Sequence, residues 1–391
     1  MKNIIYLDNS ATTPLCPEAK AAMAEAMEIY GNPSSLHPLG KEAHDLLEIS
    51  RRRIAATFGV RTAPLQGQIT FTASGTESDN LAIFGTAYAK ERRRGGKIIT
   101  TDSEHPGADN AFAALEKDGF EVVRIRTTGG ELDWEQYREA LDRHVFLVSM
   151  MTVNNETGAM YDIARAFSMA KVLDPAIVTH TDAVQGYLKC RLSPASIKAD
   201  LVTVSAHKIG GPKGVGALYA SPEALKRRDF VSIVQGGGQE NGFRSGTENV
   251  IGIAGFAAAA EIGFRALPQV LPHLSSLRQS AIEKLSALPV TLNLPTGTAA
   301  PHILNITLPD IRSETMLHAL SEDGICVSAG SACSSHSKNK QSRALTAFGL
   351  SPADIECSIR ISFGDQNTEE DVDRLVASLA ANIDRLVKIH H

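Results

Sequence analysis

The sequence predicts an α/β fold built around a mostly parallel β-sheet. Between residues 17 and 260, short apolar segments alternate with longer segments of helical character, which is the rhythm of repeated strand-helix-strand units. The apolar segments are continuous rather than alternating, as is typical of strands that are buried on both faces of a sheet. Sheets of this kind bind ligands just beyond the carboxyl ends of their strands.

Seven strands are expected in the first part of the chain, at 68–73, 97–101, 121–126, 145–151, 176–182, 201–206 and 216–220. An alanine-rich helix at 250–267 then leads through "PQVLP" into a second pattern. That pattern comprises a helix, a strand at 300–308, a helix at 313–324 and a strand at 325–330. We therefore expect a large domain over 15–261 and a smaller α+β domain formed by 1–14 and 262–391.

Composition limits the classes of function. The chain has 391 residues, 43% of them apolar, and its 39 basic and 44 acidic side chains give a net charge of -5. This charge argues against nucleic acid and anionic lipid as partners, and the arginine runs at 51–53 and 92–94 are better interpreted as solvated helix faces.

Asp8 comes too early for a signal peptide, and no uncharged run reaches the roughly 20 residues of a membrane helix. Five scattered cysteines without a CxxC pair favour a reducing cytoplasm and predict neither a disulfide framework nor a metal site.

Lys208 follows one of the predicted strands in "DLVTVSAHKIGGPKGVGALY". A lysine that is partly desolvated at the ligand-bearing edge of the sheet has a lowered pKa and can form a Schiff base with a carbonyl cofactor. The glycines beside it let the backbone approach a flat ring closely. The alternative is an ordinary surface lysine after a strand.

Asp182 and Gln185 lie three residues apart at the end of the preceding strand, in "THTDAVQG". If a helical turn starts there, both side chains can face one planar ligand. A carboxylate beside a pyridinium nitrogen keeps that nitrogen protonated, which makes pyridoxal phosphate an electron sink. Alone, Asp182 fits a helix cap better, but its pairing with Lys208 on the next strand favours the cofactor.

A phosphate site is expected where "FTASGTESDNLAIFG" passes from a strand through a turn into a helix, because helix N-termini attract anions. Gly75 and Thr76 are the predicted ligands, and Ser205 and His207 can donate to the same phosphate. A simple helix cap is the alternative.

Two further segments offer candidates. His105, in "DSEHPG" at another strand end, can stack on the ring or move a proton, although a loop histidine is the alternative. The glycine-rich stretch 235–249 contains Arg244 and Thr247, which can add phosphate donors unless the stretch is a flexible linker.

These segments resemble the cysteine desulfurases, the class V branch of fold type I pyridoxal phosphate enzymes. The resemblance is carried, in the family's order over essentially the whole chain, by "YLDNSATTP", "YGNPSSLH", "SGTESDNLAI", "VNNETG", "HTDAVQ", "SAHKIGGPKGVGALY", "RSGTEN", "SAGSAC" and "SIRISFG". The resemblance implies a fold type I architecture, a homodimer and pyridoxal 5'-phosphate as cofactor.

The resemblance also implies residue roles. Lys208 would hold the cofactor covalently, Asp182 would pair with its ring nitrogen, and Thr247 would reach the phosphate from the other subunit. Arg360 and Asn32 would receive the substrate carboxylate, the arginine by a bidentate fork. The remaining cofactor contacts would come from Gly75, Thr76, His105, Asn155, Gln185, Ser205 and His207.

Cys333, in "SAGSACSSHSKNKQS", matches the family's persulfide-forming nucleophile. The nearby His336, Lys338 and Lys340 would favour its thiolate. By spacing alone an accidental exposed cysteine is the alternative, whereas Cys326, inside a predicted strand, is expected to be buried.

The implied reaction removes sulfur from L-cysteine, giving L-alanine and a persulfide on Cys333. The persulfide would pass its sulfur to an acceptor protein such as an iron–sulfur scaffold or a thiolation enzyme. The alternatives are selenocysteine lyase or another class V reaction, and an inactive scaffold that keeps the fold. The sequence departs from the family in the basic stretch 334–349 and at Asp365, where an arginine is common, and both bear on which acceptor docks.

Overall fold

The computed structural model describes residues 4–60, 68–89, 96–329 and 341–387. Its largest sheet has seven strands in the order β2-β8-β7-β6-β5-β3-β4. They are β2 (Ile69–Thr72), β3 (Lys97–Thr101), β4 (Glu121–Ile125), β5 (Val145–Ser149), β6 (Val178–Asp182), β7 (Leu201–Ser205) and β8 (Gly216–Ala220). Strand β8 runs antiparallel to both neighbours and the other pairings are parallel. The predicted mostly parallel seven-stranded sheet is therefore confirmed.

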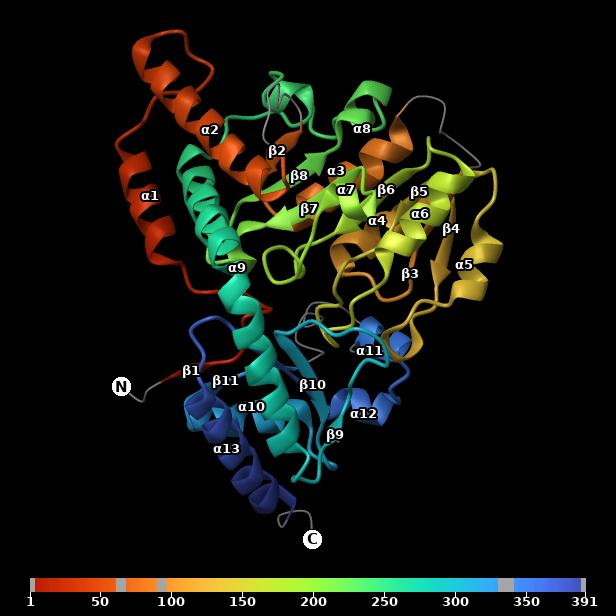
Figure 1. The fold of residues 1–391 in the computed structure, drawn as a ribbon, viewed down its shortest axis with the longest axis vertical. Coiled ribbons are helices and arrows are strands. Elements are labelled where there is room, and N and C mark those ends of the chain that lie inside the picture. The colour runs from red at the N-terminus through yellow and green to blue at the C-terminus, as the bar shows by residue number, and fades with distance from the viewer. Residues whose placement is uncertain (1–3, 61–67, 90–95, 330–340, 388–391) are drawn as a thin grey trace.

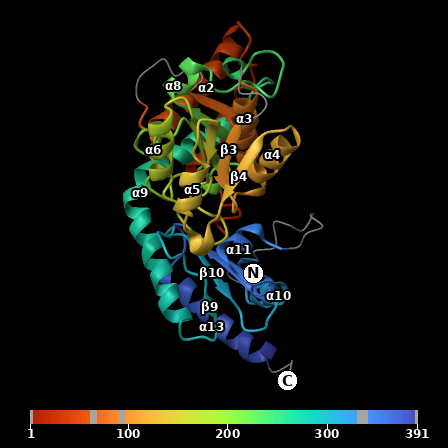
Figure 2. The same cartoon turned by 90° about the vertical axis from the view of Figure 1, so that its right-hand side faces the viewer.

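Helices cover both faces of this sheet, as the side view in Figure 2 shows. Helices α3 (Gly75–Tyr88) and α4 (Pro106–Lys117) pack on one face, where Leu81 and Phe112 belong to one apolar core. Helices α2 (Pro38–Thr57), α6 (Ile163–Leu173) and the first half of α9 (Val250–Leu285) cover the other face. Because both faces are covered, most of the strands are buried along their whole length, which explains their continuous apolar sequences.

Shorter or peripheral helices complete the chain: α1 (Pro17–Met27), α5 (Trp134–Ala140), α7 (Pro194–Ile197), α8 (Pro222–Arg227), α11 (Arg343–Phe348), α12 (Pro352–Glu356) and the long C-terminal α13 (Glu369–Val387), with 3-10 turns η2 (Thr128–Gly130), η3 (Ala206–Lys208) and η4 (Glu240–Gly242).

Helix α9 joins the two parts of the molecule in one piece (Figure 1). The predicted helix end at residue 267 is wrong, because Pro268 and Pro272 lie inside the helix. A proline removes the hydrogen bond to the carbonyl four residues earlier. Both prolines and Phe264 are exposed, so water can hydrogen-bond the carbonyls that lose their partners. Among the described residues, only α9 is long and apolar enough to span a membrane, and 56% of its most apolar window is buried inside the fold.

A second core lies beneath the first. It contains the antiparallel sheet β12-β13-β10-β9, formed by β9 (Thr291–Leu292), β10 (Ile303–Thr307), β12 (Ser328–Ala329) and β13 (Ser358–Ser362), with α10 (Ser313–Glu322) and α13 packed on it. The predicted strand 325–330 is divided in two. Its first part, β11 (Ile325–Cys326), pairs with β1 (Ile5–Tyr6), and its second part, β12, pairs with β13. Cys326 is half-buried rather than fully buried.

The N-terminal segment belongs to this second core, since Ile5 and Leu7 are buried there. The grouping of 1–14 as a whole with the C-terminal part stays a prediction. The division at residues 261 and 262 stays a prediction, because α9 passes through it without a break.

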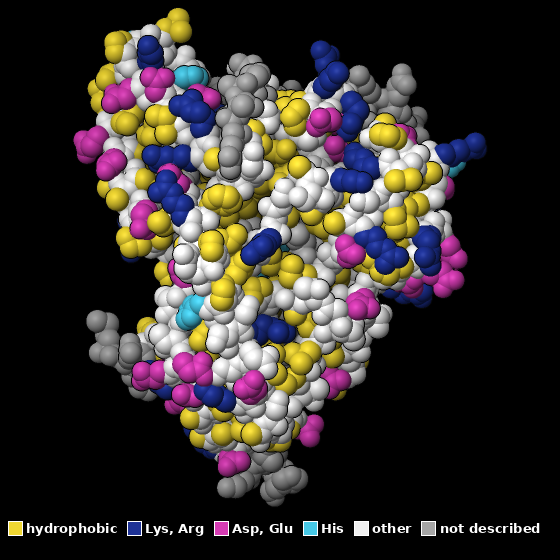
Figure 3. All heavy atoms as spheres, in the orientation of Figure 1, with side chains coloured by type: hydrophobic (Ala, Val, Ile, Leu, Met, Phe, Trp, Pro, Cys, Tyr) yellow, Lys and Arg dark blue, Asp and Glu magenta, His cyan; other side chains and the backbone are white. Residues whose placement is uncertain are grey.

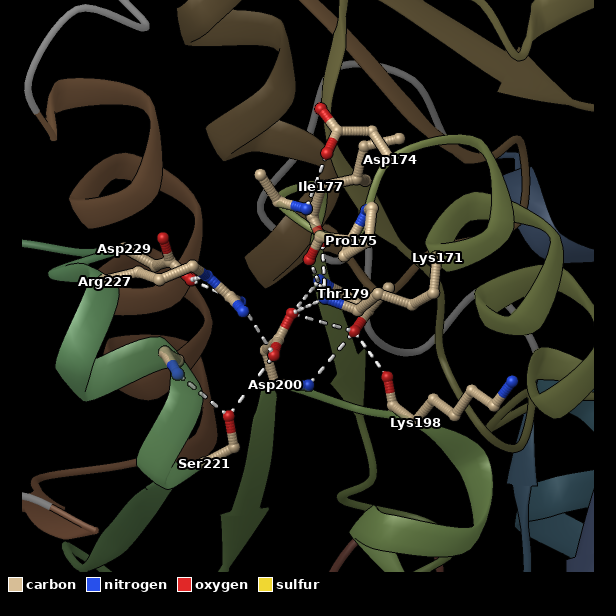
Figure 4. Close-up of polar contacts among 12 residues, drawn as sticks. Lys171, Asp174, Pro175, Ile177, Thr179, Lys198, Asp200, Ser221, Arg227 and Asp229 are labelled. Carbon is tan, nitrogen blue, oxygen red and sulfur yellow. Dashed lines mark hydrogen bonds and ion pairs between the residues drawn. The ribbon is translucent and has the colours of Figure 1, made fainter.

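A charged cluster fixes the amino-terminal end of β7, opposite the ligand-bearing edge of the sheet (Figure 4). Asp200 is buried and accepts hydrogen bonds from the Thr179 backbone N at 3.0 Å and from Arg227 Nη2 at 3.1 Å. It also forms an ion pair with Lys171, and Asp229 holds Arg227 from the other side. We expect this cluster to stabilise the fold rather than to take part in catalysis, because it lies at the end of the strands away from the site described next.

Candidate active site

A cavity of about 270 Å³ lies at the carboxyl ends of the strands. Residues that follow β2, β3, β5, β6 and β7 line it together with the N-terminal segment and Arg360 from β13. The structure thus brings together most of the predicted site residues: Gly75, Thr76, His105, Asn155, Asp182, Gln185, Ser205, His207, Lys208 and Arg360.

Lys208 ends the 3-10 turn that follows β7. Its Nζ donates hydrogen bonds to the backbone oxygens of Ser10 at 2.6 Å and Ala11 at 2.8 Å. The glycines that follow are needed for the turn. Gly210 has a φ of +83°, and a Cβ on Gly211 would lie 2.9 Å from the Ala206 side chain. The amine therefore lies on the cavity wall because Gly210 and Gly211 allow the backbone to turn directly after Lys208.

Asp182 and Gln185 lie on the neighbouring strand end, and both are buried. Asp182 Oδ1 accepts a hydrogen bond from the Val184 backbone N at 2.8 Å, and a series of turns rather than a helix follows it. Gln185 Nε2 donates to the Ser10 backbone oxygen at 2.9 Å. Burial raises the pKa of Asp182, while the charges of His105 and Lys208 oppose that rise.

Two more carboxyl groups are buried behind Asp182. Burial raises the pKa of Asp79 well above its usual range, and the nearby Asp182 charge adds to the effect. Burial likewise raises the pKa of Glu104 to about 8. Because like charges in a low-dielectric interior disfavour one another, Asp182, which faces His105 and Lys208, is the carboxyl best suited to carry the negative charge.

A neutral histidine connects Asp79 to the sheet. His180 is fully buried, and burial lowers its pKa to about 3. Its Nδ1 lies 2.8 Å from Ser149 Oγ and its Nε2 lies 3.0 Å from Thr203 Oγ1. The Asp79 carboxylate lies 3.7 Å from the same Nε2. Asp79, Glu104 and His180 were not predicted from the sequence. Asp79 and His180 are polar residues within an apolar helix and an apolar strand, which is a usable signal, whereas Glu104 lies in the loop after β3 and gave none.

His105 caps helix α4, and its Nδ1 accepts a hydrogen bond from the Gly107 backbone N at 3.1 Å. The neutral ring must therefore carry its proton on Nε2. Burial lowers the pKa of His105, and the Lys208 charge lowers it further while the Asp182 charge opposes this. The ring is thus an uncharged imidazole, which suits stacking on a flat ligand.

An anion site lies at the start of α3. Ser74 caps the helix by accepting from the Glu77 backbone N at 3.1 Å, and Gly75 and Thr76 form its first turn, whose N–H groups have no intrahelical partners. Ser205 and His207 face the same region. Burial and the Lys208 charge lower the pKa of His207 to about 4, so it acts as a neutral hydrogen-bonding group.

Arg360 closes the cavity from the second core. Its Nη1 donates to the Asn155 backbone oxygen at 2.8 Å, and its Nη2 donates to Asp8 Oδ1 at 2.7 Å. The guanidinium is 4% exposed. Among the described residues, its Nε has no hydrogen-bond partner, which leaves a donor for a bound carboxylate.

The comparisons with known proteins fit this geometry. The family model described as "Aminotransferase class-V" matches residues 5–375. The chain belongs to the class-V aminotransferase family.

Relatives with similar sequences carry NifS or cysteine desulfurase names. A "NifS/IcsS protein homolog" of Lactobacillus delbrueckii subsp. bulgaricus is 38% identical over 99% of this chain and 99% of its own length. A "Cysteine desulfurase IscS" of Methanosarcina thermophila is 38% identical over 98% of this chain and 92% of its own length. Among solved structures, a "NIFS-LIKE PROTEIN" has a TM-score of 0.89 at 33% identity, covering 98% of this chain and 100% of that one. A structure titled "SspA in complex with cysteine" has a TM-score of 0.77 at 30% identity, covering 94% of this chain and 100% of that one.

Three predicted residues of this class-V chain are not placed in the cavity. Asn32 and Thr247 are exposed and do not line it within one chain. Cys333 lies outside the described residues, as do the neighbouring His336, Lys338 and Lys340. The loop that carries Thr247 is fixed to the first turn of α3, since Arg244 Nε donates to Glu77 Oε1 at 2.7 Å.

The backbone oxygens of Ser10 and Ala11, which hold Lys208, were also missed by sequence reasoning. They belong to the quoted segment "YLDNSATTP", but a carbonyl oxygen is present in every residue. The residue types therefore gave no signal for this contact.

The cavity is suited to a polar ligand. In the part of the chain that the structure describes, several of its buried polar atoms have no hydrogen-bond partner: Ser10 Oγ, Asp79 Oδ1, Gln185 Oε1, Ser205 Oγ and Arg360 Nε. Each such atom costs about 1–3 kcal/mol if it stays unsatisfied, so their gathering around one cavity indicates a bound group. The donors at the start of α3, the Asp182 carboxyl group and the Lys208 amine, all lining one cavity, fit pyridoxal 5'-phosphate.

Proposed function

We propose that the chain is a pyridoxal 5'-phosphate-dependent cysteine desulfurase that converts L-cysteine to L-alanine and a persulfide. The observation that carries the proposal is the single cavity that joins Lys208, Asp182, His105 and Arg360. It is supported by relatives named cysteine desulfurase that are 36–38% identical over nearly the whole chain.

The cavity residues divide into three groups by what they would hold. Lys208 would attach the cofactor, Asp182 would pair with the ring nitrogen, and Gly75, Thr76, Ser205 and His207 would bind the phosphate. When bound, the cofactor withdraws electrons from the substrate Cα. His105 would lie against the ring as a neutral imidazole, and Gln185 and Asn155 would contact its phenolic oxygen side.

The substrate would be oriented by Arg360, whose unpartnered Nε can bind its carboxylate. Lys208 Nζ would move the proton from the substrate Cα. The Cys333 thiolate would then attack the substrate sulfur, so that an S–S bond forms at Cys333 while the Cβ–S bond of L-cysteine breaks. Protonation of the remaining carbon skeleton gives L-alanine.

The active unit in this proposal is a homodimer that delivers sulfur to an acceptor protein, such as an iron–sulfur scaffold or a thiolation enzyme. Thr247 is exposed and does not line the cavity of its own chain. We assign it to the phosphate site of the other subunit. Asn32, which is also exposed, would complete the substrate site.

The test is the variant Cys333→Ser supplied with L-cysteine, with alanine and persulfide measured together. We expect both products to fall at least about 1000-fold, because the nucleophile that receives the sulfur is lost. The matched control is Cys326→Ser, a half-buried cysteine that does not line the cavity, which should keep both activities. Unchanged product formation by the Cys333 variant would contradict the assigned nucleophile.

A further inference from the structure

A second cavity, of about 470 Å³, lies on the α9 side of the Lys208 turn. Lys208 contributes to the walls of both cavities, so the 3-10 turn that carries it separates them. The walls of the second cavity are mostly apolar and include Leu15, Leu188, Ile262, Val270, Leu274 and Phe363. Its volume is within the range of small-molecule sites. The assigned desulfurase chemistry makes no use of this cavity.

Lys189 is the unusual residue in its lining. The side chain is 8% exposed, and among the described residues its Nζ has no hydrogen-bond partner. A buried amine without a partner is costly, whether it stays charged or gives up its proton. Burial and, to a smaller extent, the charge of Lys208 lower the pKa of Lys189 to about 7.

A second buried group close to Lys189 is also unsatisfied. His302 is fully buried, and within the described chain neither of its ring nitrogens has a hydrogen-bond partner. The charge of Lys189 is one of the causes that lower the pKa of His302, which places the two side chains within electrostatic reach of each other. Of these two side chains only Lys189 lines the cavity, and its amine has no hydrogen-bond partner among the described residues. A buried amine of this kind points to a missing polar group in the cavity.

The only carboxylates in the described lining of this cavity are Glu18 and Asp365, and both are exposed. Solvent screens their repulsion of an incoming anion, whereas the attraction of a buried amine is screened much less. Among the described residues, this lining contains no arginine, and Lys189 and Lys208 are its only basic members. A single buried cation of this kind suits a monoanion better than a phosphate dianion.

We propose that this cavity binds a small carboxylate with a short apolar chain, whose carboxylate pairs with Lys189 and whose chain packs on the α9 wall. The apolar lining suits the hydrocarbon chain of the ligand. The single buried amine suits a ligand with one negative charge. Such a ligand would lie directly behind the turn that holds Lys208. It would therefore be able to alter that turn without entering the cofactor cavity.

The test is calorimetric titration of the purified holoenzyme with hexanoate, without L-cysteine, so that the result does not depend on turnover. Hexylamine is the matched probe with the opposite charge. Hexanoate should bind saturably and hexylamine should not. Lys189→Met should weaken hexanoate binding by about tenfold or more, because a charge-assisted hydrogen bond is lost. The control Lys213→Met removes an exposed lysine outside the cavity and should change nothing.

A second variant keeps the test decisive if Lys189→Met does not fold. Ala266 lies on the α9 wall of the cavity, and Ala266→Leu should fill part of it and weaken hexanoate binding to a similar extent. The proposal is overturned if hexanoate does not saturate, if hexylamine binds equally well, or if only Arg360→Lys abolishes binding. The last result would place hexanoate in the cofactor cavity.

The affinity should also depend on pH in one direction. The groups that act on Lys189 are Lys208, Arg360, Cys190, Asp365 and His302. Since an anion favours the protonated amine, hexanoate should bind several-fold more tightly at pH 6 than at pH 8.5, and this difference should vanish in Lys189→Met. An equal pH dependence in both proteins would assign the effect to another group.

Discussion

Lys208 shows how a single side chain depends on distant backbone. Its amine lies between the Ser10 and Ala11 carbonyls, which are almost 200 residues away in the sequence. The type of residue and its place after a buried strand were enough to predict the amine's location at the sheet edge. Its two hydrogen-bond acceptors could not be predicted, because backbone carbonyls are common to all residues.

Replacing Lys208 by Ala should remove the visible absorbance band of a lysine-bound cofactor and lower desulfuration at least about 1000-fold. The matched control Lys213→Ala lies on the same glycine-rich stretch but is exposed, and it should keep both properties. Absorbance spectra of the purified proteins and alanine release measure the two effects. A normal band in the Lys208 variant would assign the cofactor to another amine.

Glu104 should make stability depend on pH. Its pKa is raised from 4.5 to about 8, so the proton it keeps in the folded state stabilises the fold fully below pH 4.5. That contribution is lost as the pH rises toward about 8. In Glu104→Gln this loss should be absent, and the variant should gain roughly 3–4 kcal/mol relative to the parent between pH 5 and pH 8.

Urea unfolding at the two pH values measures the gain, provided that the slope with denaturant stays constant. Glu104 Oε1 accepts hydrogen bonds from Thr101 Oγ1 at 2.7 Å and from the Met151 backbone N at 2.9 Å. The amide oxygen of glutamine can accept the same two hydrogen bonds. If the parent and Glu104→Gln lost stability equally as the pH rises, Glu104 would be ionised in the folded state. That result would contradict its raised pKa.

At the scale of elements, strands were easier to predict than helix ends. All seven strands of the large sheet lie within the predicted segments, because burial on both faces imposes continuous apolar sequence. The end of α9 was placed too early, since sequence alone does not show that the two prolines face solvent. The strand at 325–330 was predicted as one piece, because its division depends on two different partners, β1 and β13.

Asp200→Asn should destabilise the fold by about 3 kcal/mol or more, because Lys171 and Arg227 would lose a buried partner. The cluster lies at the opposite end of β7 from Lys208, so the turnover number of the folded protein should stay within about twofold. Thermal and urea unfolding measure the first effect and alanine release the second. Asp174→Asn, an exposed residue nearby, is the control. A large loss of turnover without a loss of stability would move Asp200 into the catalytic machinery.

At the scale of the whole molecule, two cores share one cavity. Arg360 comes from the second core, while Asp182 and Lys208 come from the large sheet, and the N-terminal segment runs between them. The charged side chains on the face drawn in Figure 3 are of both signs, in keeping with the small net charge. The grouping of 1–14 with the C-terminal part stays a prediction, whereas the joint cavity is seen only in the three-dimensional structure.

Thr247→Val should weaken cofactor binding by about tenfold if the protein is a homodimer in which Thr247 reaches the other subunit. The protein should elute and scatter light with twice the mass of one chain. Dialysis against buffer without pyridoxal phosphate, followed by absorbance, measures retention. Thr128→Val, in a turn away from the cofactor cavity, is the control. A monomer with full cofactor retention would exclude the shared site.

The pairing of β1 with β11 has a consequence for synthesis on the ribosome. Ile5 emerges 320 residues before its partner Ile325. At about 5–20 residues per second, the segment that holds the Lys208 amine must wait tens of seconds for its place. The large sheet can form during that interval, but the pocket is complete only after β13 has supplied Arg360.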